Sequence, residues 1–273
     1  MSLSTKNEDE FQDELAQISQ QMEHTKLENN IQNTINSNTA KNGLDTEYYI
    51  KDMLNDKLKD PFSQYVQTND IGQFEKLEGT KKTDVTDDNF CKLQVKRIQA
   101  GFNQVDRHWV DDLIISIPEL EPVAFMLKNL CEIPLLENNK FVDKSKGRKN
   151  LSTNYYTEEE LELLINTLNS CKLKILKYAF LGNEYSPNYL CGVIINKKNK
   201  KKEKIIIYKM NDVINHISQD NFEIANRKTV INLGKCFSMQ RKGGDCGRKT
   251  GNQIACKLKF LELNIENCFS YAL

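Results

Sequence analysis

Residues that could perform metal and proton-transfer chemistry gather in one short stretch of the chain. Asp84 is followed, after nine residues, by Gln94, Val95 and Lys96. Side chains alternate across a β-strand, so Gln94 and Lys96 would project from the same face with their Cα atoms about 7 Å apart. If Asp84 lies on the adjacent strand, a carboxylate, an amide and an ammonium group converge on one ligand.

This set of groups suits the hydrolysis of a phosphodiester with Mg²⁺. The ion prefers oxygen ligands and retains waters, and Asp84, Gln94 and the backbone carbonyl of Val95 offer three oxygens. A bound metal lowers the pKa of a water molecule and neutralises phosphate charge, while Lys96 would orient that water. The spacing alone is a weak signal, because a strand with polar residues on its outer face is ordinary.

Two later blocks combine groups that can contact DNA. Gly101 and Phe102 place an aromatic ring, able to wedge between base steps, beside a glycine that permits close approach. The groups that can hydrogen-bond base edges are Asn103, Gln104, Gln240, Arg241, Lys242 and Asp245. Those better suited to phosphates are Arg248, Lys249 and Asn252. The alternatives are a Phe102 packed in the core and a basic loop that binds phosphates without sequence preference.

The same blocks resemble, in order, the motifs of the HinP1I family of Type II restriction endonucleases, which are related to MspI. The matching segments are Thr39–Gly43, Lys96–Trp109, Ile231–Gly234 and Met239–Gln253. The resemblance covers roughly residues 39–262 and implies a PD-(D/E)xK nuclease fold. That fold is of the α+β class, with a central mixed sheet flanked by helices.

The resemblance also implies roles for individual residues. Asp84 and Lys96 match the family's catalytic Asp and Lys, and Gln94 replaces the usual second acidic residue. Glu47 falls where the first helix carries a Glu that could assist a second metal. The stretch from Asp84 to Gln94 is shorter than in the family, as a trimmed loop would give.

Periodicity and turn signals predict the elements that must position these residues. A helix from Asp45 should stop at Asp60-Pro61, and a tight turn at Asp87-Asp88-Asn89 should join two short strands. Asp87 and Asp88 are rivals of Asp84 for the acidic position, although they fit a turn better. The other expected elements are an apolar helix through Leu130, a helix with a capping box from Thr157 to about Ser170, and strands at Tyr189–Ile195, Ile205–Lys209, Val230–Gln240 and Ile254–Leu263.

Charge is distributed unevenly along the chain. Residues 1–90 carry 9 Lys and Arg against 18 Asp and Glu, whereas residues 196–273 carry 16 against 7. A basic end is compatible with a polyanionic partner. The polar residues 1–38 are expected to form a tail outside the fold. We expect one nuclease domain over 39–273, with a catalytic core at about 39–112 and a basic DNA-recognition module at about 196–262.

Several classes of protein are excluded by the composition. The eight cysteines include no C-x-x-C pair, which excludes a zinc ribbon. No apolar stretch reaches the length of a membrane span, and no signal peptide opens the sequence. We therefore expect a cytoplasmic bacterial protein with reduced thiols.

The function predicted first is a Mg²⁺-dependent Type II endonuclease acting on double-stranded DNA. The resemblance suggests a GCGC site, cut to leave short 5′ overhangs, and a cognate DNA methyltransferase as genetic partner. A palindrome is compatible with a homodimer on DNA or with a monomer that cuts the strands in turn. The alternatives are a repair or structure-selective nuclease and a DNA-binding protein without catalysis, although a decayed site has no reason to keep Asp84, Gln94 and Lys96 together. An RNA-binding adaptor is disfavoured by the few aromatic residues in the basic module.

Overall fold

The computed structural model describes residues 41–79, 82–87, 89–99, 101–131, 156–182, 185–224, 230–241 and 253–273. The chain divides into two compact units, Met1–Thr46 and Glu47–Leu273. In the first unit, residues 41–46 are helical, and the Thr46 hydroxyl donates to the carbonyl of Asn42 at 2.7 Å. The predicted tail, residues 1–38, lies outside the described residues. The second unit contains two β-sheets and is of the expected mixed α+β class.

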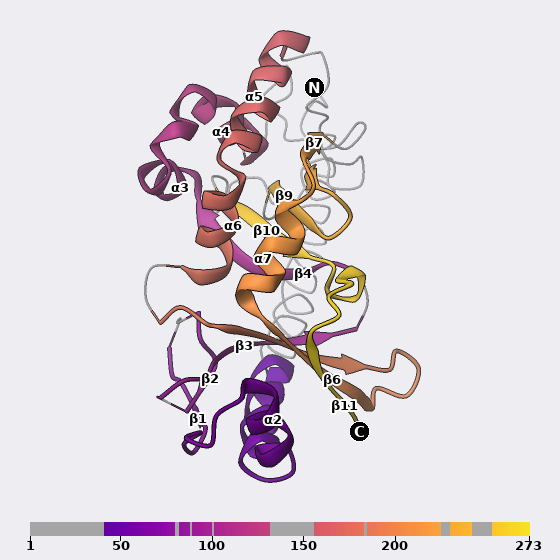
Figure 1. Ribbon diagram of the computed structural model, residues 1–273. Helices are drawn as coiled ribbons and strands as arrows, with labels where there is room; N and C mark the ends of the chain where they lie inside the picture. The colour runs from indigo at the N-terminus through magenta and orange to yellow at the C-terminus, as the bar shows by residue number, and fades with distance from the viewer. Residues whose placement is uncertain are drawn as a thin grey trace, which may run out of the picture. The chain divides into compact units, whose positions relative to one another are not determined.

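A six-stranded sheet carries the residues predicted for catalysis. Its order is β1 (Glu75–Lys76), β2 (Val85–Thr86), β3 (Lys92–Ile98), β5 (Tyr189–Ile195), β6 (Lys202–Lys209) and β11 (Cys268–Ala272). Strands β3 and β5 run parallel, and the other neighbouring pairs are antiparallel. One face packs against residues 47–55, which are helical, and α2 (Lys59–Val66), seen below the sheet in Figure 1.

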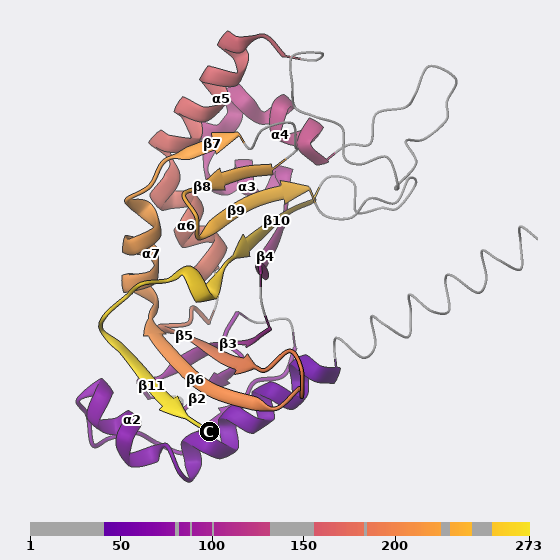
Figure 2. The same cartoon turned by 90° about the vertical axis from the view of Figure 1, so that its right-hand side faces the viewer.

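A five-stranded antiparallel sheet follows the order β4 (Asn103–Trp109), β10 (Gln253–Leu258), β9 (Phe237–Arg241), β8 (Val230–Leu233) and β7 (Phe222–Ile224). Its apolar residues, such as Ile231, Met239 and Ile254, belong to a core shared with the helices. Those helices are α3 (Val110–Ser116), the 3-10 helix η1 (Pro118–Val123), α4 (Ala124–Cys131), α5 (Glu158–Ser170), α6 (Lys172–Leu181) and α7 (Met210–Ser218). Figure 2 shows α5, α6 and α7 together on one side of this sheet.

Most of the expected elements are confirmed. Strands β2 and β3 form the predicted hairpin, β5 has the predicted bounds, and β6 begins three residues before the predicted Ile205. The capping box of α5 is complete: the Thr157 side chain accepts the Glu160 N–H, and the Glu160 carboxylate accepts the Thr157 N–H. The described cysteines are free thiols. Within the described part of the chain, every helix is too short or too polar to cross a membrane.

Three boundaries were wrong for local reasons. Pro61 does not stop a helix but lies in the first turn of α2. Proline is tolerated there because an N–H group in the first turn would have no acceptor within the helix. The expected strand Val230–Gln240 is two strands, because Gly234 turns the chain with φ at +55°. The strand after Ile254 ends at Leu258, and a 3-10 helix, η3 (Phe260–Glu262), follows it.

Candidate functional site

The β2–β3 hairpin brings Asp84 beside the strand that carries Gln94 and Lys96. Val85 pairs with Leu93, and Asp84, one residue before β2, donates its N–H to the Leu93 carbonyl at 2.8 Å. Gln94 and Lys96 are two residues apart on β3, so their side chains project from the same face of the sheet. The Asp84 carboxylate reaches β3 between them, at the Val95 N–H.

The Asp84 side chain is half-buried. Its Oδ2 accepts the Val95 N–H at 2.7 Å. Burial raises the pKa of Asp84, and the Lys96 ammonium, the Val95 N–H and the ammonium groups of Lys76 and Lys82 oppose the rise. Because burial dominates, the ionised carboxylate is less well stabilised than in water, and a bound cation would offset that deficit.

Glu47 brings a second carboxylate to the same site from the neighbouring helix. Burial raises the pKa of Glu47, and the negative charge of Asp84 raises it further, against the lowering effect of Lys76 and Lys96. The Nζ atom of Lys76, on β1, lies 3.7 Å from Glu47 Oε2. Sequence reasoning missed Lys76, because no local pattern distinguishes it from the other lysines of the chain.

Gln94 is hydrogen-bonded at one end of its amide. Its Nε2 donates to the Val105 carbonyl at 3.3 Å, whereas its buried Oε1 has no hydrogen-bond partner in the described part of the chain. An unpaired buried oxygen is costly, and a hard cation takes such an oxygen as a ligand. Among the described residues, no group of three or more His, Cys, Asp or Glu side chains is placed to hold a metal. A metal here would therefore need the Gln94 oxygen beside the carboxylates.

Asp87, the rival acid, serves the hairpin turn. Its carboxylate accepts four backbone N–H groups at 2.7 to 3.3 Å, from Gly72, Asn89, Phe90 and Cys91. A carboxylate with this many donors already has its lone pairs engaged. This geometry favours Asp84 as the acid at the site, while Asp88 lies outside the described residues.

A buried charged network lies beside the hairpin. Lys82, two residues before Asp84, forms an ion pair with Asp106 on β4 and donates to the Ala179 carbonyl at 2.7 Å. Nε2 of His108 lies 3.0 Å from Asp106 Oδ2 without forming a hydrogen bond. Burial lowers the pKa of His108 to about 4, so its ring is neutral near pH 7 and Lys82 supplies the positive charge. Sequence reasoning assigned no role to Lys82 or Asp106.

Phe102 lies at the surface. It is 40% exposed, and Lys259 Nζ lies 4.9 Å from the centre of its ring. The preceding Gly101 has φ at +75°, a conformation that glycine adopts without strain. The alternative of a core-packed Phe102 is therefore wrong. The neighbouring Asn103 is half-buried, and Gln104 is exposed.

The five-stranded sheet has a polar face opposite its core. On β4, Arg107 and Trp109 are exposed there. By strand register the same side of the sheet also carries Gln104 and Lys257, together with the buried polar side chains of Ser238, Gln240 and Gln253. Sequence reasoning missed Arg107 and Trp109 as exposed neighbours of Gln104. Val105 has no partner in the β4–β10 register, and this bulge sets Gln104 and Arg107 on the same side.

The remaining predicted DNA contacts fall largely outside the described residues. Arg241 ends β9, where its backbone pairs with Ile254. The contacts beyond the described residues are Lys242, Asp245, Arg248, Lys249 and Asn252.

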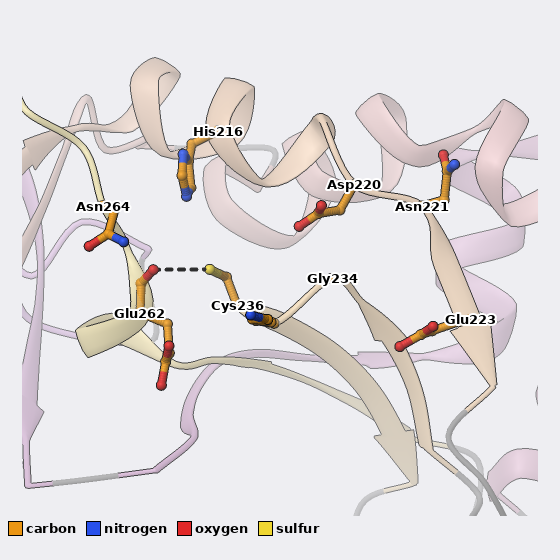
Figure 3. Close-up of a pocket in the computed structure, with 9 residues that line it drawn as sticks. His216, Asp220, Asn221, Glu223, Gly234, Cys236, Glu262 and Asn264 are labelled. Carbon is orange, nitrogen blue, oxygen red and sulfur yellow. Dashed lines mark hydrogen bonds between the residues drawn. The ribbon is translucent and has the colours of Figure 1, made fainter.

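A cavity of about 610 Å³ lies apart from all predicted residues. Figure 3 shows its polar lining, where the thiol of Cys236 donates to the Glu262 carbonyl at 3.4 Å. Asp220 packs against Gly234 at one side, where a Cβ atom on Gly234 would lie 1.7 Å from a carboxylate oxygen. No residue of the predicted catalytic set lines this cavity.

A family model agrees with the motifs. Residues 83–264 match a family model described as R.HinP1I restriction endonuclease. A crystal structure of the restriction endonuclease MspI in complex with its cognate DNA superimposes with a TM-score of 0.44, at 10% sequence identity, covering 74% of this chain and 77% of that one. A search of curated proteins finds no match.

Proposed function

Because the chain belongs to the R.HinP1I restriction endonuclease family, we propose that it hydrolyses double-stranded DNA at a short palindromic site, GCGC, leaving short 5′ overhangs. The observation that carries the proposal is the contact of the Asp84 carboxylate with the Val95 N–H, which brings Asp84 between Gln94 and Lys96 on β3. A carboxylate, an unpaired amide oxygen and an ammonium group can together support metal-assisted phosphodiester hydrolysis.

The residues at the site fit a Mg²⁺ ion. Asp84, the Oε1 atom of Gln94 and the Val95 carbonyl would hold it, with Glu47 near enough to serve a second ion. When bound, the metal supplies an acidified water and neutralises charge on the phosphate. The charge of Lys96 lowers the pKa of both Asp84 and Glu47, which places its ammonium near the two carboxylates, where it can donate to the attacking water and orient it.

The DNA would lie along the polar face of the five-stranded sheet. Phe102 would enter the base stack as a wedge. The side chains proposed to reach base edges are Asn103, Gln104, Gln240, Arg241, Lys242 and Asp245. Those proposed to contact phosphates are Arg248, Lys249 and Asn252.

Digestion of a phage genome with Mg²⁺, followed by sequencing of the fragment ends, tests the function directly. We expect every end to map to GCGC. If the ends map to another tetranucleotide, the GCGC assignment is wrong, but the nuclease activity is supported. Ends at branched or damaged DNA would favour a structure-selective nuclease, and binding without cleavage would favour an inactive DNA-binding protein.

Substitution of the catalytic set tests the mechanism. Asp84→Ala, Gln94→Ala and Lys96→Ala should each lower the cleavage rate at least about 100-fold while specific binding persists. Asp111→Asn is the matched control, because its carboxylate pairs with Lys128 at 2.7 Å on neighbouring helices. An Asp84→Ala variant that cuts at the wild-type rate, with Asp87→Ala inactive, would move the acid to Asp87.

The proposed activity would also threaten the genome of the cell that makes the enzyme. Unmodified GCGC sites in its own genome would be cut, so a DNA methyltransferase for the same site should accompany the gene. A homodimer on the palindrome would cut both strands in one encounter. Sedimentation with and without a cognate duplex distinguishes this from a monomer acting twice.

A further inference from the structure

Two consecutive residues of strand β4 contact the β2–β3 hairpin and the segment that leads into it. The carbonyl of Val105 accepts a hydrogen bond from Gln94 Nε2. The carboxylate of Asp106 pairs with Lys82, two residues before Asp84. The first contact holds the proposed amide ligand, and the second anchors the segment that leads into the proposed acidic ligand.

The same strand carries groups for DNA on its other side. Gln104 and Arg107 are exposed and flank the two residues that contact the hairpin. The bulge at Val105 makes this possible, because an extra residue shifts the alternation of side chains. A displacement of β4 by bound DNA would therefore move Val105 and Asp106 as well.

We propose that Asp106 is a positioning residue that couples reading of the DNA sequence to cleavage, by holding Lys82 and through it the backbone before Asp84. This inference rests on the proposed function. Both side chains of the pair are mostly buried, with 16% of Lys82 and 18% of Asp106 exposed. The Ala179 carbonyl also accepts from Lys82, so the ammonium is tied to α6 as well as to β4.

Kinetics of purified variants provide the first test. In Asp106→Asn, cognate DNA should bind within about twofold of wild type, while single-turnover cleavage falls about 10–100-fold. The ratio of cleavage rates between the cognate site and a site with one altered base should fall toward one. Asp111→Asn should change neither quantity. Unchanged cleavage and discrimination in Asp106→Asn would overturn the proposal.

A double variant separates positioning from folding. Lys82→Met with Asp106→Asn removes both charges, so no unpaired charge stays buried and thermal stability should return toward wild type. Cleavage should remain as low as in the worse single variant, because the two residues act through each other. If cleavage recovers together with stability, the Lys82–Asp106 pair serves only to stabilise the fold, and the proposal is overturned.

Hydrogen exchange on the DNA-free protein gives a readout that does not depend on activity. The Val95 amide donates to Asp84, so its exchange should accelerate at least about tenfold in Asp106→Asn, with amides of α5 unchanged. Unaltered exchange at Val95 would overturn the positioning role even in an active nuclease. If wild-type protein cuts no DNA while Val95 responds, the proposed function fails and the positioning role stands.

Discussion

The surroundings of Asp84 disfavour its ionised form, which suits the metal-binding role proposed for it. Its carboxylate keeps one backbone donor, from Val95, and burial outweighs the attraction of the nearby lysines. Asp87, only three residues later, has four donors. The contrast separates an acid that serves the hairpin turn from the acid that is proposed to bind a metal.

Neutralising Asp84 should therefore stabilise the metal-free protein. A carboxyl whose pKa is raised by folding contributes stability at low pH that is lost as pH rises through the raised value. We expect Asp84→Asn to have a higher melting temperature than wild type at pH 7, by about 2–4 °C for each kcal/mol gained, with the difference vanishing below about pH 4. Thermal unfolding with and without Mg²⁺ checks this, since the ion should stabilise wild type alone. A less stable Asp84→Asn at pH 7 would contradict the expectation.

Phe102 and Phe74 offer a matched pair for testing the wedge. Phe102 is 40% exposed and Phe74 is 1% exposed. Phe74→Ala should cost about 3–5 kcal/mol of folding stability, whereas Phe102→Ala should leave stability nearly unchanged and reduce DNA bending. Unfolding without DNA and fluorescence transfer across a labelled duplex measure the two effects. If Phe102→Ala bends DNA as much as wild type does, Phe102 does not act as a wedge.

At the scale of elements, the sequence predicted those with strong local patterns. The hairpin of β2 and β3, the capped helix α5 and the apolar strand β5 all follow from signals within a few residues. Strand β4 was missed because the bulge at Val105 breaks its alternation, so no period of two is visible. Lys82 could not be predicted either, because the Ala179 carbonyl that it binds lies 97 residues away in the chain.

The turn between β5 and β6 should add affinity for DNA without specificity. Since Ile98 pairs with Ile194 in parallel strands, the turn emerges at the end of the sheet from which β3 leads to Phe102. Its exposed lysines include Lys198 and Lys201, and the Asn196 side chain accepts the Lys198 N–H at 2.8 Å to fix the turn.

Replacing Lys198 and Lys201 by Gln should reduce the slope of log affinity against log salt by about 0.9 for each phosphate that is no longer neutralised. Affinity should fall equally for cognate and unrelated duplexes, as fluorescence anisotropy at several salt concentrations will show. Lys59→Gln, an exposed lysine on α2, should leave the slope unchanged. An altered preference between duplexes in the double variant would instead place these lysines among the base-reading groups.

At the scale of the whole molecule, buried ionisable groups set how the fold responds to acid. His108 is buried neutral, with its pKa lowered to about 4. The unfolded chain takes up a proton at this residue near pH 6.5, so stability is present above that pH and is lost as pH falls toward 4. The loss amounts to roughly 3 kcal/mol, since each pKa unit corresponds to about 1.4 kcal/mol.

A His108→Gln variant should lose this part of the acid sensitivity. Denaturant unfolding at pH 7 and pH 4.5 measures it, and the difference between the two pH values should be smaller than in wild type. His216→Gln, on the half-buried face of α7, serves as the control. If the unfolding free energy changes between pH 7 and pH 4.5 by the same amount in His108→Gln and in wild type, a group other than His108 causes the acid sensitivity.

The parallel pairing of β3 with β5 has a consequence for how the protein is made. Lys96 pairs with Gly192, which is 96 residues later in the chain. At a synthesis rate of about 5–20 residues per second, the ribosome needs about 5–20 s to add that interval. During this interval the chain already contains Asp84, Gln94 and Lys96, but strand β5, which pairs with β3, has not yet been synthesised. If these residues catalyse cleavage as proposed, a nascent chain contains them well before it can cut, because the middle of the sheet is synthesised later.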